Sequence, residues 1–188
     1  MPKAEYRSAV RSRKLINDAL ADLLQEKPLD KITVTDVVRR ADINRGTFYA
    51  HYADIPDVIQ HLVDMTFCRI RDVIDQQSMT MAEIPGVIMR QVQVVLEEDI
   101  EFYQKVMASS ISGMLQEKLC DIMLDYLLDH EAEISTVSHE EFVFMVRFCT
   151  GGLGTLYRNW LSGEIPMTLD ELTQKSVDIL NSIIQSKR

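Results

Sequence analysis

Apolar residues recur at three- and four-residue intervals along most of this chain, the spacing that gathers them on one face of an α-helix. Ile16, Ala19, Leu20, Leu23 and Leu24 begin the pattern, which resumes after each group of polar, Gly or Pro residues. No segment alternates convincingly with the two-residue period of a β-strand. The sequence therefore predicts an all-α protein of about nine helices. The helices are expected over roughly 5–25, 34–41, 45–52, 55–77, 85–98, 100–108, 114–130, 139–161 and 168–185.

The stretch 33–52, TVTDVVRRADINRGTFYAHY, predicts two short helices joined by a tight turn. Thr33 and Asp36 have the spacing of a capping box at the start of the first helix. Asp42 stands in the turn, where an aspartate tolerates the left-handed conformation. Asn44 is a favourable N-cap for the second helix. Donor, acceptor and aromatic side chains on that helix suit the edges and walls of a DNA major groove. These side chains are Arg45, Thr47, Tyr49 and His51.

Charge is distributed unevenly along the chain. The net charge of −9 by itself argues against a protein that binds nucleic acid. Residues 1–52, however, hold ten Lys or Arg against seven Asp or Glu, a net +3, and the remaining residues carry a net −12. A basic end joined to an acidic remainder suits a protein that meets phosphate at one end only. The polar residues of the second helix could be ordinary solvated side chains, but the caps, the turn and the basic end together favour DNA contact.

With these residues in place, the segment ITVTDVVRRADINRGTFYAHYADIPDVI resembles the helix-turn-helix of the tetracycline-repressor (TetR/AcrR) family of bacterial transcriptional regulators. The motifs that carry the resemblance are Ile32-Thr33-Val34 and Gly46-Thr47-Phe48-Tyr49-Ala50-His51-Tyr52. The chain departs from the family's pattern at Asp42 in place of Gly, Asn44 in place of Ser, and Ile55 in place of Lys. The last change removes one cationic contact to phosphate.

The resemblance implies a sequence-specific, ligand-responsive repressor that acts in the cytoplasm as a homodimer on a palindromic operator of double-stranded DNA. It implies a helix-turn-helix DNA-binding domain over residues 8–68 and an effector-binding and dimerisation domain over residues 69–188. We expect Arg45 and Thr47 to contact base edges, and Tyr49 and His51 to contact phosphates. The remaining expected DNA contacts are Thr33, Thr35, Asn44, Gly46, Arg13 and Lys14.

The last two predicted helices are more apolar than a helix with one buried face requires. Gly151, Gly152 and Gly154 each cost about 1 kcal/mol against Ala inside a helix, and small residues would let another helix approach closely. The resemblance implies that these helices pair with a second subunit in a four-helix bundle; the alternative is that they lie inside a monomer. The expected interface residues are Phe148, Gly152, Leu153, Leu156, Trp160, Leu172, Ile179 and Ile183.

Residues 148–163 are also similar to the C-terminal domains of those family members that include dihydroxyacetone-kinase regulators. Ten methionines are many for this length. Methionine fills irregular gaps in a core, but it can equally line an adaptable cavity. The resemblance favours a cavity for a small apolar or amphipathic effector. Its expected lining is His61, Met65, Met89, Tyr103, Met107, Met123 and Tyr126, each of which could instead be an ordinary partly buried side chain.

The sequence gives no support for an enzyme, a metal site or a cofactor. The four histidines have no metal-type spacing with one another or with the three cysteines. Gly151 to Gly154 lie inside a helical pattern, so they are not a phosphate loop. No apolar run is long enough for a membrane span. A rival hypothesis from another class is a helical homodimer that binds a protein or small ligand and has lost DNA binding, consistent with Ile55 and the acidic total.

Overall fold

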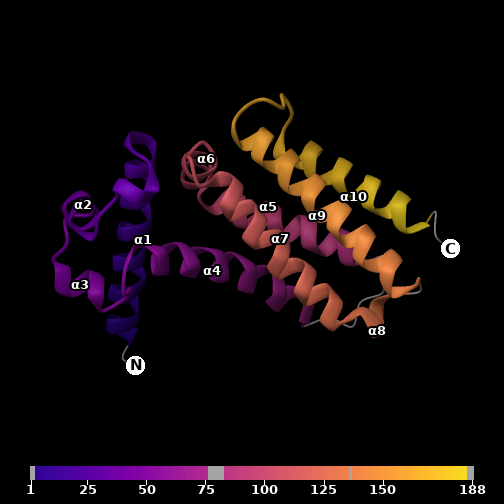
Figure 1. Cartoon of the computed structure of the whole chain (residues 1–188), viewed down its shortest axis with the longest axis horizontal. Helices are drawn as coiled ribbons and strands as arrows, with labels where there is room; N and C mark the ends of the chain where they lie inside the picture. Colours follow the sequence, from indigo (N-terminus) through magenta and orange to yellow (C-terminus); the bar gives the residue numbers. More distant parts are fainter. Residues whose placement is uncertain (1–2, 76–82, 136, 186–188) are drawn as a thin grey trace. The chain divides into compact units, whose positions relative to one another are not determined.

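The computed structural model describes residues 3–75, 83–135 and 137–185, and all secondary structure in these ranges is helical (Figure 1). This confirms the prediction of an all-α fold. The elements are α1 (Lys3–Glu26), η1 (Leu29–Lys31), α2 (Val34–Arg40), α3 (Arg45–Tyr49), α4 (Ile55–Asp75), α5 (Ile84–Glu98), α6 (Ile100–Met107), α7 (Ser112–Asp129), α8 (Glu131–Ile134), α9 (His139–Leu161) and α10 (Leu169–Gln185).

The predicted helices agree with the structure within a few residues, and two short elements, η1 and α8, are additions. The four-residue helix α8 follows α7 directly and lies between the helices predicted over 114–130 and 139–161. A single turn of helix has no apolar period long enough to recognise. The predicted end of the fourth helix near residue 77 lies outside the described residues.

The described residues divide into two compact units. Unit 1 comprises the chain up to Asp64 together with Glu101–Ser112, and unit 2 comprises Met65–Ile100 with the chain from Gly113 onward. Helix α4 therefore begins in unit 1 and ends in unit 2, and nearly all of α6 belongs to unit 1. The expected boundary after residue 68 separates a DNA-binding domain from an effector-binding and dimerisation domain by their functions, and it stays a prediction.

The core of unit 1 begins with the apolar face of α1. Ile16, Leu20 and Leu24 are buried there, together with Val37 of α2 and Phe48 of α3. The tight packing of these three helices follows from their short apolar faces, each of which needs the others to be covered.

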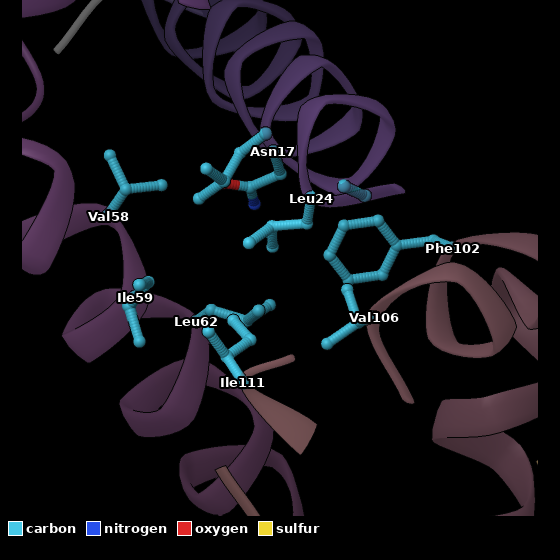
Figure 2. Close-up of a pocket in the computed structure, with 10 residues that line it drawn as sticks. Asn17, Leu24, Val58, Ile59, Leu62, Phe102, Val106 and Ile111 are labelled. Carbon is cyan, nitrogen blue, oxygen red and sulfur yellow. The ribbon is translucent and has the colours of Figure 1, made fainter. Parts of the chain in front are cut away.

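Residues 101–112 complete unit 1 by covering α1 and the first turns of α4. Phe102, Val106 and Ile111 point toward Leu24 and Leu62 around a small apolar cavity (Figure 2). Its volume of about 10 Å³ matches a single water-sized sphere, far below the size of a typical ligand pocket. The cavity thus belongs to the packing of unit 1 and is too small for the expected effector.

Unit 2 contains α5, α7, α9 and α10. Phe142 is almost completely buried and packs with Leu124 and Val146. The hydroxyl of Tyr157 on α9 lies 3.4 Å from that of Thr173 on α10, so these two buried hydroxyls are partners. None of the described helices is long and apolar enough to cross a membrane.

Candidate nucleic-acid interface

The N-terminus of α2 is fixed by a capping box. The Asp36 amide donates to Thr33 Oγ1 at 3.2 Å, and the Thr33 amide donates to Asp36 Oδ2 at 3.0 Å. Lys27 Nζ lies 2.7 Å from the same carboxylate oxygen. The hydrogen bonds from Lys27 and Thr33 lower the pKa of Asp36 below its usual range. The capping prediction for Thr33 and Asp36 is thereby confirmed.

A sharp turn separates α2 from α3. Asp42 has φ 52°, the left-handed conformation that the sequence allowed for it. Asn44 then caps α3, because its Oδ1 accepts from the Thr47 amide at 2.7 Å. A Cβ on Gly46 would lie 3.1 Å from that oxygen, so a larger residue would crowd the cap. The cap and the turn together fix the direction in which α3 leaves α2.

Helix α3 presents its polar face to the exterior of unit 1. Phe48 is fully buried and holds the helix on the core, whereas Tyr49 is 55% exposed and lies edge-on to Phe48 with ring centroids 5.5 Å apart. Arg45 is exposed, and its Nη2 donates to Thr35 Oγ1 of α2 at 2.6 Å. This contact joins two of the residues expected to meet DNA and orients the guanidinium before any DNA binds.

The other residues expected to meet DNA lie on the same unit. Thr33 and Thr35 are exposed at the start of α2, and Lys14 is exposed on α1, where it pairs with Asp18 at 3.2 Å. Arg13 is exposed on α1 and His51 is half-buried just after α3. Burial lowers the pKa of His51, and the positive charge of Arg13 lowers it further. The structure thus gathers all the predicted positions on α1, α2, α3 and the turn that follows.

Tyr52 and His61 form a contact that the sequence did not predict. Tyr52 is 3% exposed, and its hydroxyl has no hydrogen-bond partner within the described part of the chain. His61, expected in an effector pocket, lies edge-on to the Tyr52 ring at 5.5 Å between centroids. Ile55, which stands where the family often has Lys, is buried in the core. No spacing in the sequence links Tyr52 to His61, because their contact depends on the packed fold.

Ion pairs connect α6 to the helix-turn-helix. Lys105 Nζ lies 2.7 Å from Asp22 Oδ1 on α1, and Gln25 Nε2 donates to the Lys105 carbonyl at 2.6 Å. The other oxygen of Asp22 lies 3.9 Å from Arg40 of α2, and Arg40 in turn pairs with Glu26 at 2.7 Å. These hydrogen bonds raise the pKa of both Lys105 and Arg40. Residues 101–112 are therefore held on unit 1 by polar contacts as well as by their apolar side chains.

The residues expected around an effector are divided between the two units. His61, Tyr103 and Met107 belong to unit 1, and Met65, Met89, Met123 and Tyr126 belong to unit 2. Met89 is buried and its sulfur accepts from Tyr157, and the Tyr126 ring lies edge-on to Phe67 and tilted against His130. Met65 is exposed. The effector pocket therefore stays a prediction.

The residues expected at a dimer interface have mixed exposure. Phe148 and Ile179 are 66% and 56% exposed, Gly152 and Leu156 are also exposed, and Leu153, Trp160 and Ile183 are half-buried. Trp160 donates to the Met167 carbonyl at 2.7 Å. Leu172 is buried inside unit 2. Its side chain can therefore contribute to such an interface only indirectly, by packing beneath the residues at the surface. Phe144, absent from the expected set, is 69% exposed.

Comparison with known proteins identifies relatives of both parts of the chain. A family model described as "Bacterial regulatory proteins, tetR family" matches residues 16–62, and one described as "Transcriptional regulator C-terminal region" matches residues 88–182, half of the chain. The uncharacterized HTH-type transcriptional regulator YxbF of Bacillus subtilis is 36% identical over 67 residues. This alignment covers 35% of the chain and only 18% of that protein's length.

Solved structures share the fold along nearly the whole chain. A putative TetR-family regulator from Syntrophomonas wolfei is 14% identical with a TM-score of 0.63, and covers 92% of this chain and 94% of its own. The fatty acid degradation regulator FadR of Bacillus halodurans is 16% identical with a TM-score of 0.63 over 90% and 94%. The dihydroxyacetone kinase operon activator DhaS is 22% identical with a TM-score of 0.57 over 93% and 96%. At such low sequence identity, structural similarity shows that the fold is shared and shows nothing more.

Proposed function

The chain belongs to the tetR family of bacterial regulatory proteins and is a DNA-binding transcriptional regulator, and we propose that it acts as a homodimeric, ligand-responsive repressor on a palindromic operator. In this proposal each subunit places α3 in the major groove of one half-site, and an effector bound to the remainder of the subunit weakens that contact. The site of action is the cytoplasm, where the operator lies.

The capped and exposed helix α3 is the observation that carries the DNA-binding part. Arg45 and Thr47 are assigned to base edges, because a guanidinium and a hydroxyl near the start of a recognition helix can reach them. Tyr49, His51 and the start of α2 are assigned to phosphates, where hydroxyl, imidazole and backbone N–H groups position the protein without reading sequence.

The rival hypothesis, a dimer that has lost DNA binding, rested on Ile55 and the acidic total. Ile55 is buried, so its apolar side chain contributes to the core of unit 1 instead of leaving a gap in a contact surface. Arg45 and Tyr49 remain exposed. A chain that no longer met DNA would have no evident use for a capped helix that holds these side chains outward, so the regulator is favoured.

An apolar face of unit 2 supports the dimer. Phe144, Phe148, Gly152 and Leu156 follow one another at four-residue intervals on α9, and the two phenyl rings stack with centroids 6.4 Å apart. Ile179 adds an exposed apolar side chain on α10. Exposed apolar residues that gather on one helix face mark an interaction surface, and a second copy of this chain is the partner that a two-fold operator requires.

The glycines of α9 support the same proposal. A Cβ added at Gly151 or Gly152 would meet nothing within 4 Å, whereas one added at Gly154 would lie 2.8 Å from Gln116 Cγ. Packing inside the subunit therefore accounts for Gly154 but not for the other two. Close approach of a helix from a second subunit would account for them.

The proposed route for the effector runs through two segments. Helix α4 is covalently continuous between the units, and residues 101–112 leave unit 2 to pack in unit 1. An effector that prefers one arrangement of these segments by about 1–3 kcal/mol would change operator affinity measurably. Lys105 and its partners are the polar contacts through which the second segment would act.

Selection of bound duplexes from a random pool tests the proposal directly. We expect an enriched palindrome with half-sites about one turn of DNA apart or somewhat more. Enrichment of a single asymmetric half-site would contradict the dimer, and the absence of any enriched or salt-sensitive duplex binding would favour the rival.

A further inference from the structure

Three rings lie close together beside the recognition helix, and the charge of Arg13 acts on both imidazoles among them. Arg13 comes from α1, His51 and Tyr52 follow α3, and His61 comes from the second turn of α4. The Tyr52 ring is close to both imidazoles, with centroid distances of 6.3 Å to His51 and 5.5 Å to His61. All four residues belong to unit 1. We refer to Arg13, His51, Tyr52 and His61 as the histidine cluster.

The charges around the histidine cluster have opposing effects on proton binding. Burial lowers the pKa of both imidazoles, and Arg13 lowers each of them further. His61 also lowers the pKa of His51, whereas Asp57 and Asp64, on the same helix as His61, raise that of His61. Burial and cationic neighbours prevail, so both imidazoles hold fewer protons near neutral pH than free histidine does.

The Tyr52 hydroxyl shows that the histidine cluster has unmet hydrogen-bonding capacity. It is buried and lacks a partner within the described residues, an arrangement that native proteins rarely keep unless it serves a purpose. Once the imidazoles are protonated, the histidines and Arg13 offer only donors. Phosphate oxygens are acceptors that match such a group, and charge-assisted hydrogen bonds to them are strong.

We propose that Arg13, His51 and His61 form a proton-linked phosphate site, in which a backbone phosphate of the duplex binds as the two imidazoles take up protons. The inference rests on DNA binding by unit 1. His51 lies just beyond the C-cap residue of the recognition helix, which brings the histidine cluster beside the expected groove contacts. Ile55 is an uncharged, buried side chain at the position where the family often has Lys, and the cluster supplies positive charge instead.

The expected pH dependence follows from the charge of the phosphate. A bound phosphate raises the pKa of a neighbouring imidazole, so the complex holds more protons than the free protein and its DNA. Affinity must then rise as pH falls through the histidine pKa values of the complex, and it levels off below those of the free protein. Each imidazole contributes up to about tenfold in affinity for every unit by which its pKa rises on binding.

The first test measures duplex affinity by fluorescence anisotropy at constant ionic strength. The pH runs from about 8 to about 5.5, which brackets the usual histidine pKa of about 6.5. We expect the wild-type chain to bind the selected palindrome at least about tenfold more tightly at the acid end. His51→Gln and His61→Gln should each lose part of this gain, and His139→Gln, which changes an exposed histidine of unit 2, should retain it.

The outcomes separate the inference from the proposed function. Binding that does not change with pH, or an acid-end gain that His61→Gln leaves intact, would overturn the proton-linked site while leaving DNA binding established. No duplex binding at any pH would count against the proposed function itself.

The second test identifies the source of the phosphate and guards against misfolded variants. Proton NMR of the imidazole C–H groups gives the pKa of each histidine in the folded chain, alone, with duplex and with inorganic phosphate at a matched phosphate concentration. We expect duplex, and not inorganic phosphate, to raise the pKa values of His51 and His61 while those of His130 and His139 stay fixed. If inorganic phosphate raised the pKa values of His51 and His61 as much as the duplex does, the ligand would be a free anion and not the duplex. That result would overturn the assignment.

Discussion

Arg45 is the residue at which sequence recognition can be separated from general affinity. Its guanidinium is exposed and held by Thr35, so it is directed outward before binding. Arg45→Ala should reduce discrimination at one base pair by about 1–3 kcal/mol, because a bidentate contact to a base edge is lost. Gel-shift titrations with the selected operator and its single-base variants measure this. Arg90→Ala, an exposed arginine of unit 2, is the matched control, and unchanged base preference in Arg45→Ala would refute the assignment.

Asp36 links pH to the stability of unit 1. Its pKa is lowered in the folded chain, so the carboxylate stabilises the fold above the unfolded-state pKa of about 3.9, and this stabilisation is lost as pH falls below that value. Asp36→Asn should therefore lower the melting temperature at neutral pH, and the difference from wild type should shrink in acid. Thermal unfolding by circular dichroism at several pH values measures both. Asp30→Asn, an exposed aspartate on η1, is the control; a difference that persists unchanged in acid would exclude the carboxylate as its cause.

The residues that the sequence predicted correctly are those whose partners lie close by in the chain. Thr33 and Asp36 are three apart, and Asn44 caps a helix that begins at the next residue. The proximity of Tyr52 and His61 and the pair formed by Lys105 and Asp22 join residues whose closeness depends on the packed fold, so no local spacing could indicate them.

At the scale of elements, the glycines of α9 distinguish packing within a subunit from packing between subunits. Gly152→Ala adds a Cβ that meets nothing in the subunit, so it should leave the fold unharmed or stabilise it by up to about 1 kcal/mol, yet weaken dimerisation. Gly154→Ala should instead destabilise the subunit, because its Cβ displaces Gln116 and its hydrogen bond to Thr155. Sedimentation equilibrium and thermal unfolding separate the two effects. An unchanged dimer dissociation constant in Gly152→Ala would remove this face from the interface.

The sequence located almost every helix, but it did not assign residues 101–112 to the DNA-binding unit. An amphipathic period reveals that a helix has a buried face and not which neighbour covers it. Phe102 tests the assignment. Because the side chain is buried, Phe102→Ala should destabilise unit 1 by about 3–5 kcal/mol.

Two probes report that loss separately. Circular dichroism follows all helices, and the fluorescence of Trp160, the single tryptophan, follows unit 2. In Phe102→Ala the dichroism transition should move to lower temperature more than the fluorescence transition does, whereas Gln104→Ala, exposed on the same helix, should move neither. Equal shifts of both signals in Phe102→Ala would show that this side chain stabilises the two units alike.

At the scale of the whole molecule, charge separates the part that meets DNA from the part that does not. Residues 1–52 carry a net +3 and the rest a net −12, so the acidic remainder would repel phosphate wherever it approached a duplex. Contacts to phosphate must then come from unit 1 of each subunit. A dimer consequently doubles the number of phosphates neutralised when both half-sites are present.

That doubling is measurable as salt dependence. The slope of log affinity against log salt concentration is about −0.9 for each phosphate contact, so a palindromic duplex should give a slope about twice that of a duplex with one half-site. Arg13→Gln, which removes one expected phosphate contact from each subunit, should reduce the slope by about 2 on the palindrome and by about 1 on the half-site. Arg90→Gln should change neither slope, because Arg90 lies in the acidic part of the chain, where no contact to phosphate is expected. Equal slopes on the two duplexes would mean that only one recognition helix engages DNA, and the two-fold arrangement proposed for α9 and α10 would then lose its functional reason.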